Sequence, residues 1–319
     1  MKYSKSLHLA AMLLIFTAST NAFASNMFPK DVFVTLKDSG ELAKFAGEHK
    51  WKGEPVMLYN AITPDGKRLV VSSPKMQTVY VFDTKTHKRI AQVKVGKASK
   101  GLKISPNGKE VYVANEGEAS ISVVDLEKYE NVATIKTDDM PHNVRFSHDG
   151  KKAYVTLQGG AGLGVIDTKT RKVERVIPTP GLIGAHNLDI SKDGKIAYIR
   201  DTSNHMGFLD LMSGKMLKVL QVGQGHAGID VSPDGKTIYT GAIADEIVTV
   251  IDAKSMQVVN KIKVGFGPHG VRTSKNGRWL YVAVTADDKF VVIDTKSNTV
   301  EKEYTLAAFP FWVSVQGNP

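Results

Sequence analysis

The chain is a succession of short hydrophobic stretches separated by polar turns. Between residues 142 and 177 such stretches fall at 142–147, 153–156, 164–167 and 172–177, with turn-forming residues between them. Valine, isoleucine and tyrosine are frequent in these stretches, which favours a pleated and partly buried surface. No part of the sequence shows sustained helical spacing of apolar residues. The pattern therefore predicts four short β-strands here, joined by tight turns.

The same arrangement recurs at a nearly constant period. An Asx-Gly pair, which is a strong hairpin signal between β-rich stretches, stands at Asp65-Gly66, Asn107-Gly108, Asp149-Gly150, Asp193-Gly194, Asp234-Gly235 and Asn276-Gly277. A second aspartate follows each pair, at Asp83, Asp125, Asp167, Asp210, Asp252 and Asp294. Successive pairs are 42, 42, 44, 41 and 42 residues apart. Four strands per unit at this period is the blade pattern of a β-propeller.

The two ends of the chain supply the parts of a further blade. Residues 311–317 match an innermost strand and its turn, and residues 32–36 match the second strand of a unit. Residues 41–55 are shorter than their counterparts, so we expect the outer part of this blade to be trimmed. Pairing the two ends would close the ring and remove open sheet edges. We therefore predict an all-β fold, a single seven-bladed β-propeller over residues 25–319 whose seventh blade is closed by N- and C-terminal strands.

Particular motifs carry a resemblance to a known family. Tyr112-Val-Ala-Asn115, followed by Ser122-Val-Val-Asp125, resembles the repeat of the Tyr-Val-Thr-Asn (YVTN) propellers, and so does Gly267-Pro-His-Gly270 before its turn. The resemblance covers essentially the whole predicted propeller. It implies the propeller fold but not one function, because related propellers include lactonases, haem-binding domains of nitrite reductases, metal chaperones and surface scaffolds.

The first 24 residues have the features of a secretory signal peptide. Lys2 and Lys5 form a basic start, an apolar stretch is centred on residues 9–16, and Ala22-Phe-Ala24 is a small-x-small cleavage site. The apolar stretch is too short to span a bilayer, and we expect no transmembrane segment. Cleavage near Ala24-Ser25 would deliver the mature chain to the periplasm or the exterior.

Composition narrows the chemistry. The sequence has no cysteine, which excludes disulfides, thiolate metal sites, cysteine nucleophiles and covalent c-type haem attachment. The net charge is +10, but for an exported chain we expect no nucleic-acid partner, and we expect a monomer. The loops on the face where the chain enters each innermost strand are acidic, whereas the Asx-Gly turns on the opposite face are basic. We call these the upper and lower faces, and an acidic upper face would attract cations.

Histidines recur at one position of the repeat. The residues eight positions before the six turn glycines are Leu58, Lys100, His142, His186, Ala227 and His269, and His226 precedes Ala227. Four consecutive blades would thus place an imidazole where the innermost strand begins, at the upper mouth of the channel. Neutral imidazole binds zinc, copper, iron and nickel and serves as an axial haem ligand. We interpret His142, His186, His226 and His269 as candidate cofactor ligands and metal ligands. A purely structural role, in which the histidines bond backbone carbonyls at the strand entrances, is the alternative.

One irregular loop adds an auxiliary candidate. Residues 201–206 break the repeat and place His205 beside Met206 on the upper face. A thioether next to imidazole favours copper slightly over zinc, although methionine more often fills gaps in a core.

A second series lies three positions further along the innermost strands. It comprises Ala61, Lys103, Arg145, Asp189, Asp230, Arg272 and Trp312. Buried charges need partners, so we predict that Arg145 pairs with Asp189 and that Asp230 pairs with Arg272, across blade boundaries.

Three functional readings follow. The first is an exported binding protein that holds copper, zinc or haem at the histidines, as a chaperone or assembly factor with an exported protein partner. The second is a lactonase-like or metal-dependent enzyme, although no Ser-His-Asp set or paired carboxylates stand out. The third is a ligand-free interaction scaffold.

Overall fold

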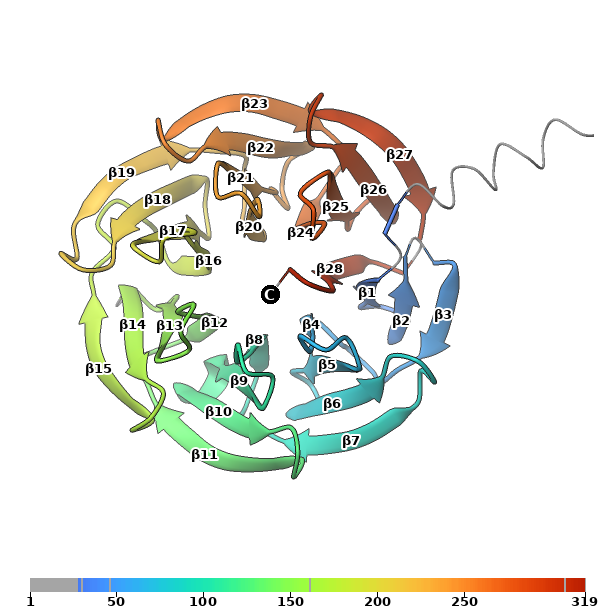
Figure 1. Ribbon diagram of the computed structural model, residues 1–319, viewed down its shortest axis with the longest axis vertical. Coiled ribbons are helices and arrows are strands. Elements are labelled where there is room, and N and C mark those ends of the chain that lie inside the picture. Colours follow the sequence, from blue (N-terminus) through green and yellow to red (C-terminus); the bar gives the residue numbers. More distant parts are fainter. Residues whose placement is uncertain (1–27, 30, 46, 161, 307, 319) are drawn as a thin grey trace, which may run out of the picture. The chain divides into compact units, whose positions relative to one another are not determined.

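The strands form the predicted ring of blades. The computed structural model describes residues 28–318 except 30, 46, 161 and 307, and residues 31–319 belong to one compact unit. The predicted signal peptide, residues 1–24, lies outside the described residues. Within the described part, 28 strands form seven four-stranded sheets, which surround a central axis as blades (Figure 1). The prediction of an all-β, seven-bladed propeller is confirmed.

Each sheet runs from an innermost strand to an outermost one. The closing blade contains β28 (Pro310–Val315), β1 (Val32–Leu36), β2 (Glu41–Lys44) and β3 (His49–Lys52). The next three contain β4 (Asn60–Ile62), β5 (Arg68–Ser73), β6 (Thr78–Asp83), β7 (Arg89–Lys94); β8 (Ser99–Ile104), β9 (Glu110–Asn115), β10 (Ser120–Asp125), β11 (Glu130–Lys136); and β12 (Pro141–Phe146), β13 (Lys152–Leu157), β14 (Gly162–Asp167), β15 (Lys172–Ile177).

The remaining three blades follow the same order. They contain β16 (Ala185–Ile190), β17 (Ile196–Asp201), β18 (His205–Asp210), β19 (Met216–Gln221); β20 (Ile229–Val231), β21 (Thr237–Thr240), β22 (Ile247–Asp252), β23 (Gln257–Lys263); and β24 (Pro268–Thr273), β25 (Trp279–Val284), β26 (Lys289–Asp294), β27 (Thr299–Thr305). In the described part the one helix is a short 3₁₀ turn, η1 (Glu116–Glu118). None of its helices could cross a membrane.

The turn chemistry explains the regularity of the repeat. In the Asx-Gly turn of the third complete unit, the Ser147 hydroxyl donates to Asp149 Oδ1 over 2.7 Å, and the Lys151 amide donates to the same oxygen over 3.1 Å. The glycines of all six Asx-Gly pairs have φ between 70° and 79°. Glycine adopts this left-handed conformation without steric cost, so the turn requires it in every unit.

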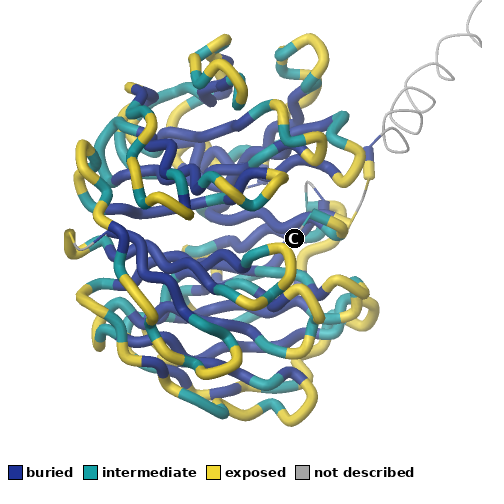
Figure 2. Tube along the Cα trace, turned by 60° about the vertical axis from the view of Figure 1, so that its left-hand side comes forward, coloured by how far each residue is buried: buried dark blue, intermediate teal, exposed yellow. Residues whose placement is uncertain are grey.

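The core lies between neighbouring blades. Tyr112 of β9 packs edge-on against Phe146 of β12, with ring centroids 4.9 Å apart. The same cluster joins Ile121 of β10 to Val144 and Val155 of the next blade. Figure 2 shows buried residues along the strands and exposed ones at the turns. Each side chain buried here contributes on the order of 25 cal/mol per Å² of apolar surface, so inter-blade packing holds the ring together.

The closing blade is formed by both ends of the chain. β28 pairs antiparallel with β1, with Val315 opposite Val32 and Ser314 opposite Phe33. The outer strands β2 and β3 have four residues each, compared with six in β6 and β7. The blade is thus shortened on its outer side, as predicted, but keeps all four strands.

Candidate metal centre

The innermost strands deliver the histidines to the upper mouth of the channel. His142, His186 and His269 are each the second residue of their strand, in β12, β16 and β24. In all three strands the pairing register shifts at this point. Such bulges re-aim side chains away from the regular pleat. His226 lies in the loop before β20, one residue before the position that corresponds to the other three histidines.

The four imidazoles follow one another around the mouth. Ring centroids are 3.7 Å apart for His142 and His186, 4.4 Å for His186 and His226, and 5.4 Å for His226 and His269. His269 then stacks on Phe311 of β28 at 4.1 Å. The structure therefore brings all four predicted histidines into one arc of rings.

His142 is saturated by protein partners. Its Nε2 is 2.8 Å from the Tyr59 hydroxyl, and its Nδ1 is 3.3 Å from Glu116 Oε1. Burial raises the pKa of Tyr59, so its hydroxyl stays protonated and donates to Nε2. The Nδ1–H of His142 then donates to Glu116, which also pairs with Lys100 at 3.3 Å. His142 has no free nitrogen for a ligand, and its role in this structure is to support the ring of His186.

His186 and His269 differ from His142 because each has one free nitrogen. Nδ1 of His186 lies 2.6 Å from the Gln158 side-chain oxygen, and Nδ1 of His269 lies 3.1 Å from the Phe311 carbonyl oxygen. These oxygens only accept, so Nδ1 carries the hydrogen and Nε2 presents its lone pair. Both Nε2 atoms are buried and make no hydrogen bond within the described residues. Hydrogen bonds to the distal nitrogen orient metal-binding histidines in the same way.

The protonation states suit metal binding. Burial lowers the pKa of both His186 and His269 well below the usual range, and neighbouring histidines add to this effect. Burial and then the proximity of His142 lower the pKa of His226 to about 4. All three rings are therefore neutral near pH 7. Metal ligation requires the neutral imidazole.

Three of the four histidines bring a nitrogen close to one another. One nitrogen each of His186, His226 and His269 lies within 4.8 Å of the other two. Around an ion with metal–nitrogen bonds of about 2.0–2.1 Å, tetrahedral ligand nitrogens are about 3.3 Å apart. Each pair would therefore need to close by at most about 1.5 Å to bind one tetrahedral ion.

The auxiliary candidates lie elsewhere. His205 is one-third exposed and its Nδ1 is 3.1 Å from Asp201, and it is not in the converging group. Met206 is fully buried in the apolar cluster that includes Phe208 and Ile229. Met206 thus offers no thioether to the histidine group, and the slight preference for copper that rested on it loses this basis.

Comparisons with known proteins identify the family. The model of the YNCE-like beta-propellers matches residues 30–181 and 183–278. The chain belongs to the YNCE-like beta-propeller family. This agrees with the resemblance to YVTN-repeat propellers. No curated protein matches the chain.

Solved structures share the fold of this YNCE-like propeller. Hydrazine synthase from Kuenenia stuttgartiensis is 22% identical with a TM-score of 0.76, over 82% of this chain and 90% of that one. A functionally unknown protein from Desulfotomaculum acetoxidans DSM 771 is 15% identical with a TM-score of 0.77, over 91% and 100%. Dihydro-heme d1 dehydrogenase NirN, in complex with DHE, is 16% identical with a TM-score of 0.68, over 92% and 77%. At these identities the likeness concerns the fold.

The YNCE-like propeller also has site residues that sequence reasoning missed. Tyr59, Glu116, Gln158 and the Phe311 carbonyl hold the histidine rings. Tyr59 is one residue beyond the repeat position that carries histidine in other blades, so the period could have indicated it. Gln158 follows β13 in a loop, and no sequence signal marks it.

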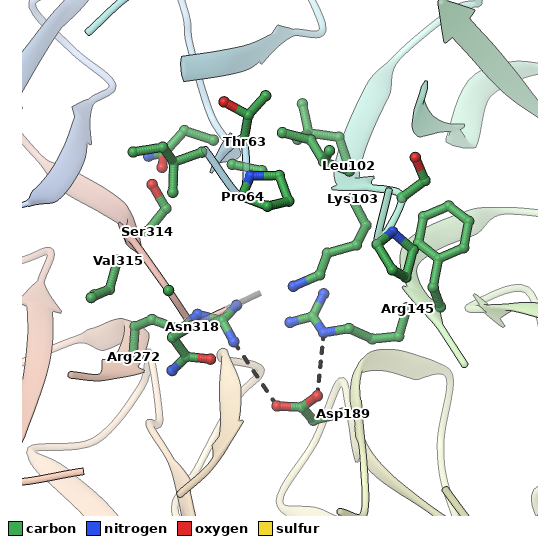
Figure 3. A pocket seen from close by; sticks show the side chains of 18 of the residues that line it. Thr63, Pro64, Leu102, Lys103, Arg145, Asp189, Arg272, Ser314, Val315 and Asn318 are labelled. Carbon is green, nitrogen blue, oxygen red and sulfur yellow. Dashed lines mark ion pairs between the residues drawn. The ribbon is translucent and has the colours of Figure 1, made fainter. Parts of the chain in front are cut away.

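The second predicted series lies below the histidines in the channel. Arg145 Nε is 3.5 Å from Asp189, and Arg272 Nη1 is 2.6 Å from Asp230, which confirms both predicted pairs. Arg272 also lies 3.9 Å from Asp189. Figure 3 shows Arg145, Asp189 and Arg272 in a pocket together with Lys103. The pairs tie four neighbouring blades together at the axis.

Proposed function

We propose that this YNCE-like propeller binds a zinc or copper ion through His186, His226 and His269 at the upper mouth of its channel. The observation that carries the proposal is the pair of buried Nε2 atoms of His186 and His269. Each has its lone pair free while its Nδ1 is fixed by an acceptor. A buried polar atom without a partner costs about 1–3 kcal/mol, and a shared ion would satisfy both atoms at once.

The donor set fits a borderline metal ion. Three neutral imidazoles leave one coordination position open, as in tetrahedral zinc sites with a water or substrate in the fourth place. Such an ion would act as a Lewis acid toward whatever occupies that place. The protein contributes the ring orientation through Gln158 and the Phe311 carbonyl. Because the same nitrogen set binds copper(II) more tightly than zinc(II) in general, we expect copper to displace zinc.

Binding is favoured over hydrolysis because the carboxylate that contacts this arc of histidines is not free to act as a base. Glu116 is hydrogen-bonded to His142 and paired with Lys100, so its oxygens are already engaged. Together with the predicted export of the chain through residues 1–24, this supports a periplasmic metal-binding protein that serves as a chaperone or assembly factor for an exported partner.

Haem is the alternative cofactor, and it is supported by a haem-related neighbour of the same fold, dihydro-heme d1 dehydrogenase NirN. An axial haem bond needs one free imidazole nitrogen, which His186 or His269 would provide. A haem complex would differ from a bare ion in its absorption, so the two are separable by experiment.

The test uses protein purified without a histidine tag and stripped with a chelator. Titration with Zn²⁺ and with Cu²⁺ should show one site per chain, and His186→Ala and His269→Ala should each weaken it by about 100-fold. His205→Ala is the matched control and should leave the affinity unchanged, because His205 is outside the converging group. Failure of the intact protein to bind either ion would rule out the proposal. A Soret band on hemin titration, lost in the same variants, would assign haem instead.

A further inference from the structure

The lower end of the channel contains a cavity that the histidine site does not use. Its volume is about 290 Å³, near the lower limit of about 300–1,000 Å³ for small-molecule pockets. Its walls are formed by innermost strands and by Asx-Gly turns, including Thr63, Ser105 and Ser147. Lys103, Arg145 and Arg272 reach toward its centre from three different blades (Figure 3).

The charges at this cavity do not cancel. The basic groups here are Lys103, Arg145 and Arg272, and the carboxylates near them are Asp189 and Asp230. When these three basic groups and two carboxylates are all ionised, their net charge is one positive charge. In a poorly solvated channel, an uncompensated charge is costly. The site therefore favours one additional negative charge.

The carboxylate of Asp230 has no hydrogen-bonding capacity left for Lys103. It accepts from Arg272 Nη1 over 2.6 Å and from both the amide and the hydroxyl of Thr273 over 2.7 Å. The Asn318 amide adds a contact at 3.2 Å. This carboxylate is fully buried, so its role is to fix Arg272.

Asp189 is also engaged. It accepts the amides of Ile190 over 2.9 Å and of Val231 over 3.1 Å. Arg145 Nε lies 3.5 Å from its Oδ1 but is not aligned for a hydrogen bond. The two carboxylates thus leave N–H groups of Arg145 and Lys103 without a hydrogen-bond acceptor.

Arg145 and Lys103 have those unmatched donors. Arg145 is 4% exposed, and its Nε and Nη2 make no hydrogen bond within the described residues. Only its Nη1 is bonded, to Asn143 Oδ1 over 3.0 Å and to the Val144 carbonyl over 2.9 Å. No hydrogen bond or ion pair joins the Lys103 ammonium to any residue of the described part. Burial, and then Arg145 and Arg272, lower the pKa of Lys103 well below its usual range. An anion bound beside this amine would favour its protonated form.

The rest of the cavity lining is apolar and suits the hydrocarbon part of a ligand. Leu102, Ile62, Phe146 and Val315 line the cavity beside Trp312. Trp312 is 4% exposed, and the Arg272 guanidinium lies 5.9 Å from its ring. A single anionic group with a hydrocarbon or aromatic portion would match both halves of the lining. A more highly charged anion would be repelled by Asp189.

We propose that the lower end of the channel binds a small organic monocarboxylate, with the carboxylate between Lys103, Arg145 and Arg272 and the apolar portion against Trp312. Arginine and lysine donate strong charge-assisted hydrogen bonds to carboxylates. This site uses none of the histidine ligands and does not depend on the proposed metal function.

The experiment titrates metal-free protein with acetate, butyrate, benzoate and 3-phenylpropionate by calorimetry, with tryptophan fluorescence as a second readout. At least one acid should bind with a dissociation constant below about 1 mM, and the neutral analogue benzamide should not. Lys103→Met should weaken binding about 10- to 100-fold, as for loss of a hydrogen bond to a charged group.

Matched variants locate the site. Lys100→Met changes the same strand at its opposite end and should leave the affinity unchanged, as should His186→Ala. If Lys103→Met lowers the melting temperature, Lys103→Arg serves instead and should retain binding within about threefold. Failure of all four acids to bind overturns the proposal, as does tighter binding of inorganic phosphate. Equal affinity in the Lys103→Met protein overturns the location.

Discussion

At the residue scale, the hydrogen bonds made by the two ring nitrogens decide whether a histidine has a lone pair free to bind a ligand. His142, His186 and His269 occupy equivalent positions in their strands. Only His142 has both nitrogens occupied. In His186 and His269 an acceptor fixes Nδ1 and frees Nε2. Equivalent positions in a repeat thus yield one supporting ring and two candidate ligands.

This distinction predicts the effect of changing Gln158. Gln158→Leu removes the acceptor from His186 Nδ1, so the hydrogen can move to Nε2 and the ring loses its orientation. Metal affinity should fall about 10- to 100-fold, the usual effect of removing such a partner. Competition with a chromogenic chelator measures it. Gln158→Glu keeps an acceptor and should retain affinity. Gln92→Leu, an exposed change on β7, is the control, and an equal loss there would contradict the argument.

At the element scale, the repeated hairpins are fixed by carboxylates that bond turn amides. The Thr170 amide, and then Lys152, lower the pKa of Asp167 to about 2. The Arg278 side chain, and then turn amides, lower the pKa of Asp294 to about 2. Turn hydrogen bonds also lower the pKa of Asp65, Asp83, Asp125, Asp149, Asp193, Asp210, Asp234 and Asp252. The same chemistry therefore acts in every repeat.

These shifts predict acid sensitivity. A carboxyl whose pKa is lower in the folded state than its unfolded value of about 3.9 stabilises the fold above that value. The stabilisation is lost as the pH falls toward the folded value of about 2. The buried histidines, whose pKa is also lower in the folded state, destabilise the fold as the pH falls below about 6.5. The urea midpoint should therefore decline from about pH 6.5 downward, and the turn carboxylates should add a further drop between about pH 4 and 2.

A single variant tests the assignment to the turns. Asp167→Asn should lower the midpoint at pH 7 and reduce its further drop in acid, because that carboxyl no longer titrates. Asp138→Asn changes an exposed aspartate in an upper loop and should leave the profile unchanged. If the two variants had identical profiles, the turn carboxylates would not be the cause.

At the scale of the whole molecule, closure by β28 connects the ends of the chain and completes the channel. β28 pairs with β1, and its Phe311 carbonyl fixes His269 at the upper mouth. Its Trp312 lines the cavity at the lower end. One strand therefore serves ring closure, the candidate metal centre and the proposed carboxylate site.

Removal of residues 310–319 should accordingly affect the entire protein. The truncated chain would expose the edge of β1, whose five residues are all buried in the intact ring. We expect a lower melting temperature and concentration-dependent association, because open hydrophobic edges pair with other chains. Light scattering and thermal unfolding measure both. A synthetic peptide of residues 310–319 should partly restore the melting temperature by strand addition. An unchanged melting temperature in the truncated protein would contradict the closure argument.

The sequence alone determined the architecture because each unit repeats the same turn residues and the same pattern of β-forming stretches. Asx-Gly turns need a glycine with positive φ, and the alternating β-rich stretches need a partner on each side. The 42-residue period also places Arg145 beside Asp189 and Asp230 beside Arg272 in neighbouring blades, and it brings four histidines to about the same level of the channel.

Only the tertiary structure decided which side-chain atoms are free. Gln158 meets His186 and the Phe311 carbonyl meets His269 across blade boundaries, so no local pattern encodes these contacts. The same holds for Arg145, whose unmatched donors depend on how Asp189 is occupied by amides of its own and the next blade. Periodicity places a residue in a ring, whereas hydrogen bonding between residues distant in sequence determines whether its polar atoms are satisfied or available to a ligand.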